Sequence, residues 1–346
     1  MCLDCIRCHS TQARRIALNV HARIRQKWGL PGEVPGHSDG IPCNLCVNNC
    51  RMRNGEYGYC GLRKNVQGKI EGVFSTKGKL SWYHDPLPTN CVGDWVCSGG
   101  TGCGYPAYSY KKGPEYGYEN LAVFPYACTF HCLYCQNWHF RYHTFENKFE
   151  PVEKLVRAVN QNTACICYFG GDPSPQLPFL LHASQVALER NKDRILRICW
   201  ETNGAMSESF LRQIGELSLA SGGCIKIDLK AWDETLHTAL TGVTNRQTLK
   251  NFERLSTLIP KRPDPPFLIA STLMVPGYID AQEVGQIAQF IKTLNPEIPY
   301  SLLAFHPQYK MADLPPTSRR QAQQCLDAAM QSGLKRVKVG NMHLLW

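Results

Sequence analysis

Short apolar segments alternate with amphipathic segments from Asn120 to the C-terminus. The apolar segments have the length and composition of buried strands, and amphipathic ones such as 151–161 and 281–295 have the spacing of helices. Strands that alternate with helices predict a parallel sheet with right-handed crossovers, so the fold class is α/β. Six or seven such units fit an open, partial (β/α)6-type barrel. The predicted strands are 121–127, 164–170, 195–201, 224–230, 267–275, 300–305 and 336–340.

The first 118 residues show a different pattern, rich in cysteine, glycine and turn residues. One helix is predicted near 11–28, and alternation about glycine turns at 66–83 predicts a small antiparallel element. This region has too few periodic apolar residues for a good core of its own, and bound metal would add the missing stability. We therefore expect a Cys-rich, mostly irregular metal-binding region at 1–118 and a barrel domain at 119–346.

The chain has a formal net charge of +10, but its basic residues are spread out and form no long block. A solvated basic surface therefore explains the charge better than a nucleic-acid partner does. No apolar run is long enough to predict a membrane span, and the N-terminus lacks the layout of an export signal. We expect a cytoplasmic protein, in which the 18 cysteines more often hold metal than form disulfides.

Three cysteines follow the first predicted barrel strand with the spacing Cys128-x3-Cys132-x2-Cys135. Three thiolates on one loop hold three corners of a cubane iron–sulfur cluster and leave the fourth iron open to an outside ligand. The carboxyl end of a barrel strand is also where such folds carry their reactive groups. A zinc knuckle that lacks one ligand, or three core cysteines, would not explain this agreement of spacing and position.

Polar residues follow the next three predicted strands. A Gly-Gly-Asp turn stands at 170–172, Glu-Thr-Asn at 201–203, and Asp-Leu-Lys at 228–230. Strands of a parallel sheet are normally apolar on both faces, so polar residues at their ends suggest a binding site. The alternatives are an ordinary glycine turn, a helix cap at Asn203 and a surface ion pair.

Four further cysteines form a quartet with the spacing of a closed metal site. They are Cys43, Cys46, Cys50 and Cys60, on turns rich in glycine and asparagine. Four thiolates suit zinc or a second iron–sulfur cluster equally well, and the spacing does not choose between them.

Ten of the eleven remaining cysteines fall into three smaller groups. Either or both of the groups Cys2, Cys5, Cys8 and Cys91, Cys97, Cys103 ligate an auxiliary cluster, jointly or with His9, or they remain free thiols. Cys165, Cys167, Cys199 and Cys224 lie in predicted core strands, where we expect small buried hydrophobic side chains.

These motifs together resemble the radical SAM superfamily, in particular AmmeMemoRadiSam-system and pyruvate formate-lyase-activating-enzyme-like proteins. The similarity runs in order over residues ~43–341, and it includes the aromatic Tyr134 just before the third cysteine of the loop. It implies a radical SAM barrel with a [4Fe-4S] cluster on Cys128, Cys132 and Cys135, and S-adenosylmethionine (SAM) chelated to the open iron. Reductive cleavage of SAM then yields a 5′-deoxyadenosyl radical that abstracts a hydrogen atom.

The resemblance also implies roles for individual residues. Tyr134 packs near the adenine, and the glycine-rich turn contacts the SAM amino group. Glu201, Thr202 and Asp228 form a possible monovalent-cation site, and His306 lines the cavity near SAM or substrate. The predicted cofactor-binding residues are Tyr134, Gly170, Gly171, Asp172, Glu201, Thr202, Asn203, Asp228, Lys230 and His306.

The predicted function is that of a radical SAM oxidoreductase acting on an undetermined small molecule or peptide. One alternative is a glycyl-radical-enzyme activase that acts on a partner protein, and another is an iron–sulfur electron-transfer protein without SAM turnover. The last does not explain the Gly-Gly-Asp and Asp-Leu-Lys motifs. The resemblance further implies an electron donor such as flavodoxin or ferredoxin. We expect the segments around residues 1–8 and 91–118 to lie near the mouth of the active site.

Overall fold

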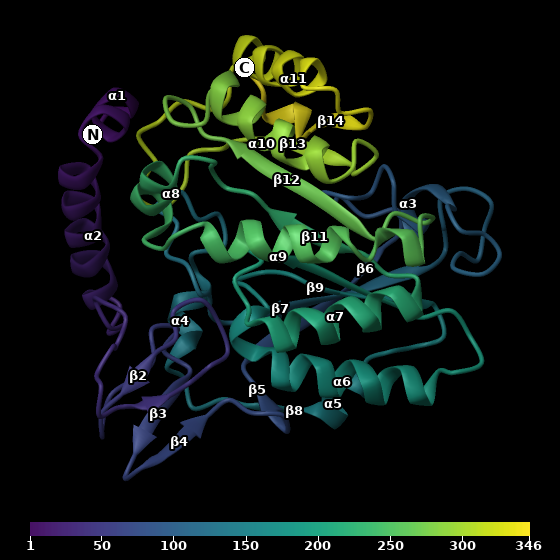
Figure 1. Ribbon diagram of the computed structural model, residues 1–346. Helices are drawn as coiled ribbons and strands as arrows, with labels where there is room; N and C mark the ends of the chain where they lie inside the picture. The colour runs from purple at the N-terminus through teal and green to yellow at the C-terminus, as the bar shows by residue number, and fades with distance from the viewer.

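An eight-stranded sheet forms the centre of the computed structural model, which describes all 346 residues (Figure 1). Seven of its strands are parallel and confirm the seven predicted strands, and β6 pairs antiparallel with β7 at one edge. β14 lies at the opposite edge and does not pair with β6, so the sheet is an open, partial barrel. In sheet order the strands are β14 (Val337–Gly340), β13 (Tyr300–Ala304), β12 (Leu268–Met274), β11 (Ile225–Asp228), β10 (Arg197–Thr202), β9 (Thr163–Tyr168), β7 (Glu119–Pro125) and β6 (Leu80–Pro86).

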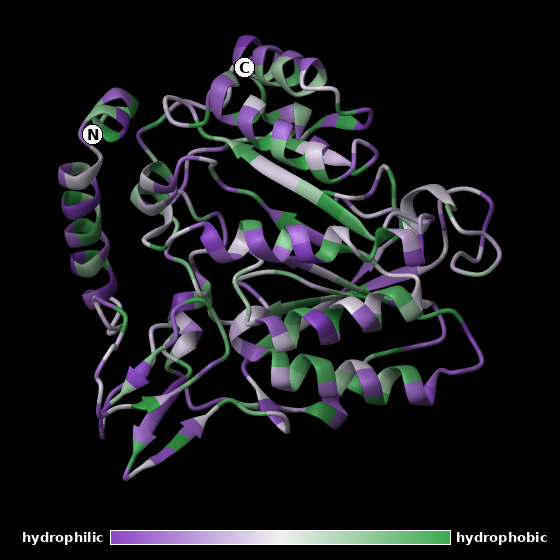
Figure 2. Cartoon of the chain, in the orientation of Figure 1, coloured by the Kyte–Doolittle hydropathy of each residue, from purple (hydrophilic) through white to green (hydrophobic).

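Helices follow the parallel strands and cover the outside of the sheet, and hydrophobic and hydrophilic residues alternate along their ribbons (Figure 2). Every residue of β9 is buried, as expected for strands covered on both faces. Asp280 caps α10, because its side chain accepts a hydrogen bond from the backbone N of Glu283 at 2.9 Å. The covering helices are α5 (Val152–Arg157), α6 (Leu177–Arg190), α7 (Glu208–Ser221), α8 (Glu234–Thr241), α9 (Arg246–Ser256), α10 (Ala281–Leu294) and α11 (Arg319–Gln331).

Two N-terminal helices pack beside the barrel, and the second confirms the helix predicted near 11–28. They are α1 (Leu3–Cys8) and α2 (Ser10–Gln26), which Figure 1 shows along the left edge of the molecule. The Arg7 guanidinium joins α1 to Asp280 at 3.2 Å. None of the helices is long and apolar enough to cross a membrane.

The remaining short elements of the N-terminal region form three small two-stranded pairs. The antiparallel element predicted at 66–83 is partly confirmed, because β3 and β4 form a hairpin there. β6, at the end of that stretch, instead extends the main sheet. The bounds are β1 (Ile41–Pro42), β2 (Arg51–Met52), β3 (Arg63–Val66), β4 (Lys69–Gly72), β5 (Lys77–Gly78) and β8 (Glu150–Pro151).

Residues 87–118, here called the inner segment, run along the amino ends of the barrel strands and reach into its interior. The Trp95 indole N–H donates to Ser301 Oγ on β13 at 3.0 Å. The ring of Tyr108 packs against Gly222, where an added Cβ would lie 2.2 Å from it. The expectation that 91–118 lies at the active-site mouth is therefore wrong for most of this segment, although its first residues line a cavity that adjoins the predicted site. β6 and the inner segment both precede residue 119 and both pack with the barrel strands. The division of the chain at residue 118 stays a prediction.

A buried ion pair holds the inner segment in place. Arg197, at the start of β10, donates from Nη1 to Glu115 Oε1 at 3.0 Å, and its other Nη bonds the second oxygen. Their side chains are 3% and 0% exposed. Ser109 Oγ and the backbone N of Tyr110 also donate to Glu115. These bonds satisfy a charge that would otherwise be costly to bury.

Replacing Glu115 by alanine should lower the free energy of unfolding by about 3–5 kcal/mol, because it leaves the Arg197 guanidinium buried without its carboxylate. Urea denaturation of the two proteins measures this difference. As a control, Glu153→Ala removes a carboxylate that pairs with Arg190 on the exposed surface, and its midpoint should match the parent. Equal midpoints for the two variants would contradict an anchoring role for the buried pair.

Candidate functional site

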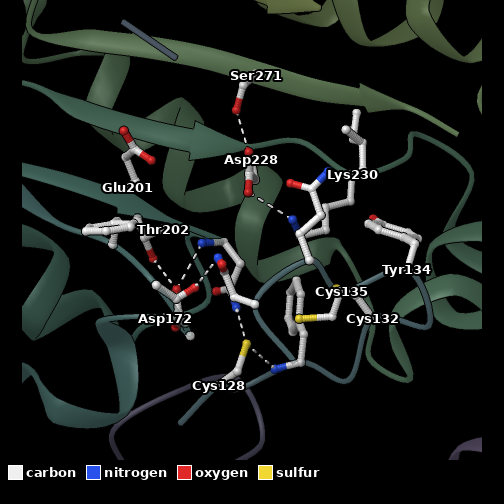
Figure 3. A pocket seen from close by; sticks show the side chains of 18 of the residues that line it. Cys128, Cys132, Tyr134, Cys135, Asp172, Glu201, Thr202, Asp228, Lys230 and Ser271 are labelled. Atoms are coloured by element: carbon white, nitrogen blue, oxygen red, sulfur yellow. Dashed lines mark hydrogen bonds and ion pairs between the residues drawn. The ribbon is translucent and has the colours of Figure 1, made fainter. Parts of the chain in front are cut away.

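A cavity of about 930 Å³ opens at the carboxyl ends of the barrel strands (Figure 3). It brings together the predicted cysteine triad and every predicted cofactor-binding residue except His306. These predicted residues come from the loop after β7 and from the ends of β9, β10 and β11, four neighbouring parallel strands. The lining residues that were predicted are Cys128, Cys132, Tyr134, Cys135, Gly170, Gly171, Asp172, Glu201, Thr202, Asn203, Asp228 and Lys230.

The cysteine loop is fixed by backbone hydrogen bonds to the end of α8. The N–H groups of His131 and Leu133 donate to the carbonyl oxygens of Thr241 and Leu240 at 2.8 and 2.9 Å. Burial raises the pKa of the Cys128 thiol, and it raises that of Cys132 to about 11 even though Lys230 opposes the shift. These buried thiols therefore favour their neutral form unless a bound cation compensates the charge of the thiolates.

The carboxylate of Asp172 ties the loops after β9 and β10 together (Figure 3). Its side chain accepts hydrogen bonds from Thr202 Oγ1 at 2.7 Å, from the backbone N of Asn203 at 3.0 Å and from the backbone N of Ser174 at 3.1 Å. Asp172 is 3% exposed, and this burial raises its pKa. Protein donors thus hold the Asp172 oxygens, and its predicted contact with the SAM amino group stays a prediction.

Asn203 carries this network to the cysteine loop. Its side-chain Nδ2 donates to Thr129 Oγ1 at 2.7 Å and lies 3.7 Å from Cys128 Sγ. Its Oδ1 accepts from the backbone N of Ala205 at 3.0 Å, which turns the chain at the end of β10. The position of Cys128 therefore depends on the same bonds that hold Asp172.

Both glycines of the turn at 170–172 are required by the geometry. Gly170 has φ +91°, and an added Cβ would lie 2.7 Å from the ring of Phe124. At Gly171 an added Cβ would lie 2.3 Å from the carbonyl oxygen of Ala127, in the loop that leads to Cys128. The absent side chains let the two loops approach each other directly.

Two ion pairs involve residues that line the cavity. Lys230 Nζ lies 2.9 Å from Asp228 Oδ2, and Ser271 Oγ donates to the other oxygen of Asp228. Although burial by itself lowers the pKa of Lys230, the neighbouring Asp228, Tyr134 and Cys132 groups raise it overall. Lower in the barrel, Lys226 Nζ lies 2.8 Å from Glu201 Oε1.

These contacts bear on the predicted monovalent-cation site. Its three groups each have a separate partner, because Glu201 pairs with Lys226, Thr202 donates to Asp172, and Asp228 pairs with Lys230. The cation site stays a prediction that this arrangement does not support.

Some residues of the cavity were not predicted from the sequence. Asn137 donates from Nδ2 to the carbonyl of Gly170 at 3.1 Å, and Ser271 bonds Asp228 from β12. The polar pair Ser271-Thr272 within an otherwise apolar strand was the available signal. The remaining unpredicted lining residues are Phe130, Gln136, Phe169, Leu229, Leu273 and Leu303.

The histidine after the sixth parallel strand does not join the cavity. His306 is solvent-exposed and is absent from the cavity lining, so its predicted role near SAM has no geometric support. Its neighbour Tyr309 instead contacts the cysteine loop, because its hydroxyl lies 3.2 Å from His131 Nε2 and accepts from Trp28 Nε1 at 3.0 Å.

The cysteine quartet lines a separate small cavity behind the site. Cys43, Cys46, Cys50 and Cys60 share that cavity with Arg63, and burial raises the pKa of Cys50 to about 12. Asn48 Nδ2 donates to the carbonyl of Thr129 at 2.9 Å, so this region packs directly on the cysteine loop. No three His, Cys, Asp or Glu side chains of the chain are gathered closely enough to hold a single metal ion. Zinc or a second cluster at the quartet stays a prediction.

Comparison with known proteins gives a consistent picture. The family model described as "Radical SAM superfamily" matches residues 123–291. An uncharacterised protein of Methanocaldococcus jannaschii is 25% identical over 311 residues, which cover 87% of this chain and 81% of that protein. An isethionate sulfite-lyase activating enzyme of Desulfovibrio desulfuricans is 31% identical over 46% of this chain, which spans 49% of that enzyme's length. A pyruvate formate-lyase-activating enzyme of Staphylococcus epidermidis is 26% identical, with 53% of this chain and 73% of that enzyme covered.

Replacing Gly171 by alanine should push the cysteine loop away from the turn, because the new Cβ meets the Ala127 carbonyl. We expect a loss of about 1–3 kcal/mol in the free energy of unfolding from this overpacking. Thermal unfolding with calorimetry measures it. Gly113→Ala is the matched control, since nothing lies within 4 Å of a Cβ at that glycine. A Gly171→Ala protein as stable as the control would contradict the close approach of the two loops.

Proposed function

This chain belongs to the radical SAM superfamily, and we propose that it cleaves SAM reductively with a [4Fe-4S] cluster ligated by Cys128, Cys132 and Cys135. Family membership implies the cluster and SAM as cofactors. When bound, they supply a 5′-deoxyadenosyl radical that removes a hydrogen atom from a substrate. The observation that carries the proposal is that the triad shares one cavity with the polar ends of three neighbouring strands.

The donor set in this cavity fits such a cluster. It contains three cysteine thiols from one loop, and no histidine or fourth cysteine is among the lining residues. Three protein ligands leave one iron of a cubane for an outside ligand.

The charged pair beside the triad suits the amino acid part of SAM. Asp228 and Lys230 offer opposite charges at the end of β11, matched to an ammonium and a carboxylate. We assign Asp172 a positioning role, because its oxygens hold the loops that carry Thr202 and Asn203. Tyr134 is buried against the cavity and supplies an apolar wall for the adenine ring.

A second cavity of about 870 Å³ adjoins the first and shares Glu201 and Leu303 with it. It is lined by the start of the inner segment and by β13 and β14, on the edge of the sheet that does not close. Trp95, Ser301 and Lys338 give it aromatic, hydroxyl and cationic groups. We assign the substrate, a polar small molecule or an extended peptide, to this cavity.

The activating-enzyme relatives favour a second candidate, in which the hydrogen donor is a glycine of a partner protein. The two candidates differ in the size of the molecule that donates hydrogen. In both, the cavity next to Glu201 receives the donor group.

Alanine at Cys132 should abolish formation of 5′-deoxyadenosine, because one cluster ligand is lost. Anaerobic protein with dithionite and SAM, followed by chromatography of the nucleosides, gives the readout. Cys325→Ala removes an equally buried thiol on α11, outside the cavity, and should retain product formation. Undiminished product from the Cys132→Ala protein, or no product from the parent, would refute radical cleavage of SAM.

The substrate class can be assigned by deuterium transfer. Cells grown in deuterated medium supply an extract that is separated into small molecules and macromolecules, and each fraction is mixed with the enzyme, dithionite and SAM. We expect deuterium in the 5′-deoxyadenosine from the small-molecule fraction, because the abstracted atom moves to that product. Deuterium only from the macromolecule fraction would instead support the activase candidate.

A further inference from the structure

Another cavity, of about 480 Å³, lies at the amino end of the barrel and shares no lining residue with the SAM cavity. Six cysteines line it, although they are scattered over more than 130 residues of sequence. Two come from the inner segment and four from β9, β10 and the residue that precedes β11. They are Cys91, Cys97, Cys165, Cys167, Cys199 and Cys224.

Strand register gathers three of these thiols in one row. Cys199 is the pairing partner of Cys167, and the pairing of Trp200 with Ile225 places Cys199 beside Cys224. Neighbouring strands lie about 4.8 Å apart, so these three side chains project side by side into the barrel. The sulfur atoms of Cys199 and Cys224 are 3.9 Å apart. Cys97 packs on the row from the inner segment, opposite the sheet.

The four strand cysteines are buried as predicted, and three of them pack with Val96 and Ile269, but polar groups also border the row. The ammonium of Lys226, whose side chain is 3% exposed, lies 3.2 Å from Cys91 Sγ and 3.3 Å from Cys167 Sγ. Arg197 also lines the cavity. Ser98, which is 2% exposed, lines it with a hydroxyl that has no hydrogen-bond partner. Glu201 and Glu115 already pair with these two cations, whereas the buried hydroxyl of Ser98 has no partner of its own. A sulfur-rich group in the cavity would accept a hydrogen bond from it.

We propose that this cavity binds an auxiliary iron–sulfur cluster, ligated by the thiolates of Cys97, Cys167, Cys199 and Cys224. Four thiol protons leave when the four cysteine–iron bonds form, and two ferrous ions, two ferric ions and four sulfides make up the cluster without an outside oxidant. Lys226 and Ser98 donate hydrogen bonds to the cluster sulfurs, which offsets the negative charge of the thiolates. Cys165 lies outside this ligand set, because its thiol donates to Asn120 Oδ1 at 3.3 Å.

The spread of the thiols selects a cluster over a single zinc ion. Four sulfurs around one zinc would lie about 3.8 Å from one another, given Zn–S bonds of about 2.3 Å. Cys167 and Cys224 stand two strands apart, so their backbones are separated by nearly 10 Å. No three thiols of the chain are gathered for one ion. Cys199 and Cys224 alone have the spacing of zinc ligands, but Cys167 lies one strand farther along the row, which favours several bridged metal atoms over one.

The test distinguishes iron bound at this site from iron bound by the cysteine triad or the cysteine quartet. A full-length background variant carries serine at Cys128, Cys132 and Cys135 and at Cys43, Cys46, Cys50 and Cys60. It is reconstituted anaerobically with ferrous iron, ferric iron and sulfide, and iron and acid-labile sulfide are measured per chain. We expect about four irons in the background, because the interior site keeps its ligands. Adding Cys199→Ala should remove them, and adding Cys165→Ala should not.

Near-ultraviolet circular dichroism of each apo protein shows whether it is folded. A folded background that binds no iron, or that binds zinc alone after reconstitution with both metals, would overturn the proposal. So would equal iron in the Cys199→Ala and Cys165→Ala proteins.

If the background does not fold, the single variants in the parent chain carry the same comparison. Cys199→Ala should lower the iron content by about four per chain, whereas Cys165→Ala should match the parent. Iron content that is unchanged by Cys199→Ala would contradict the site. Because iron content is the readout, failure here leaves the SAM proposal intact.

Discussion

The buried carboxylate of Asp172 is the constraint on which the carboxyl end of the barrel depends. It accepts hydrogen bonds from the backbone N of Ser174, from the Thr202 hydroxyl and from the backbone N of Asn203. The Asn203 side chain in turn bonds Thr129, beside Cys128. A carboxylate with 3% exposure is stable only while such donors remain in place. The three loops that follow β7, β9 and β10 therefore keep one relative arrangement, and the cysteine loop takes its position from it.

The two ends of the barrel are chemically distinct but connected. The carboxyl end carries the cysteine triad and the Asp228–Lys230 pair, whereas the amino end is filled by the inner segment and its thiols. The Lys226–Glu201 ion pair joins the two ends. Glu201 lines the cavity at the carboxyl end, here called the upper cavity, and Lys226 lines the cysteine cavity at the amino end, here called the lower cavity. One contact of 2.8 Å, between a buried ammonium and a partly exposed carboxylate, therefore links the two ends.

The parallel sheet could be predicted from the sequence because each strand is a short apolar run between amphipathic helices. The upper cavity could be predicted because its residues follow strand ends directly, and the carboxyl ends of parallel strands meet at one edge. Local pattern was sufficient in both cases. It was not sufficient for His306, since a lone histidine after a strand carries no information on the direction of its side chain.

The inner segment and the lower cavity could not be predicted for a different physical reason. The inner segment has no hydrophobic periodicity, so nothing local indicates that it packs at the amino end through Glu115 and Trp95. The row of Cys167, Cys199 and Cys224 depends on strand register, and a slip by one residue would turn each thiol to the opposite face. Register is set by the whole sheet, so these cysteines look like ordinary core residues in the sequence.

The central claim is that the triad leaves one iron open and that SAM binds there. Electron–nuclear double resonance on dithionite-reduced protein with SAM labelled by nitrogen-15 at its amino group tests this directly. We predict a nitrogen-15 coupling to the cluster in the parent and in the Cys165→Ala protein. The absence of any coupling in parent protein that carries a reduced cluster and bound SAM would contradict the claim.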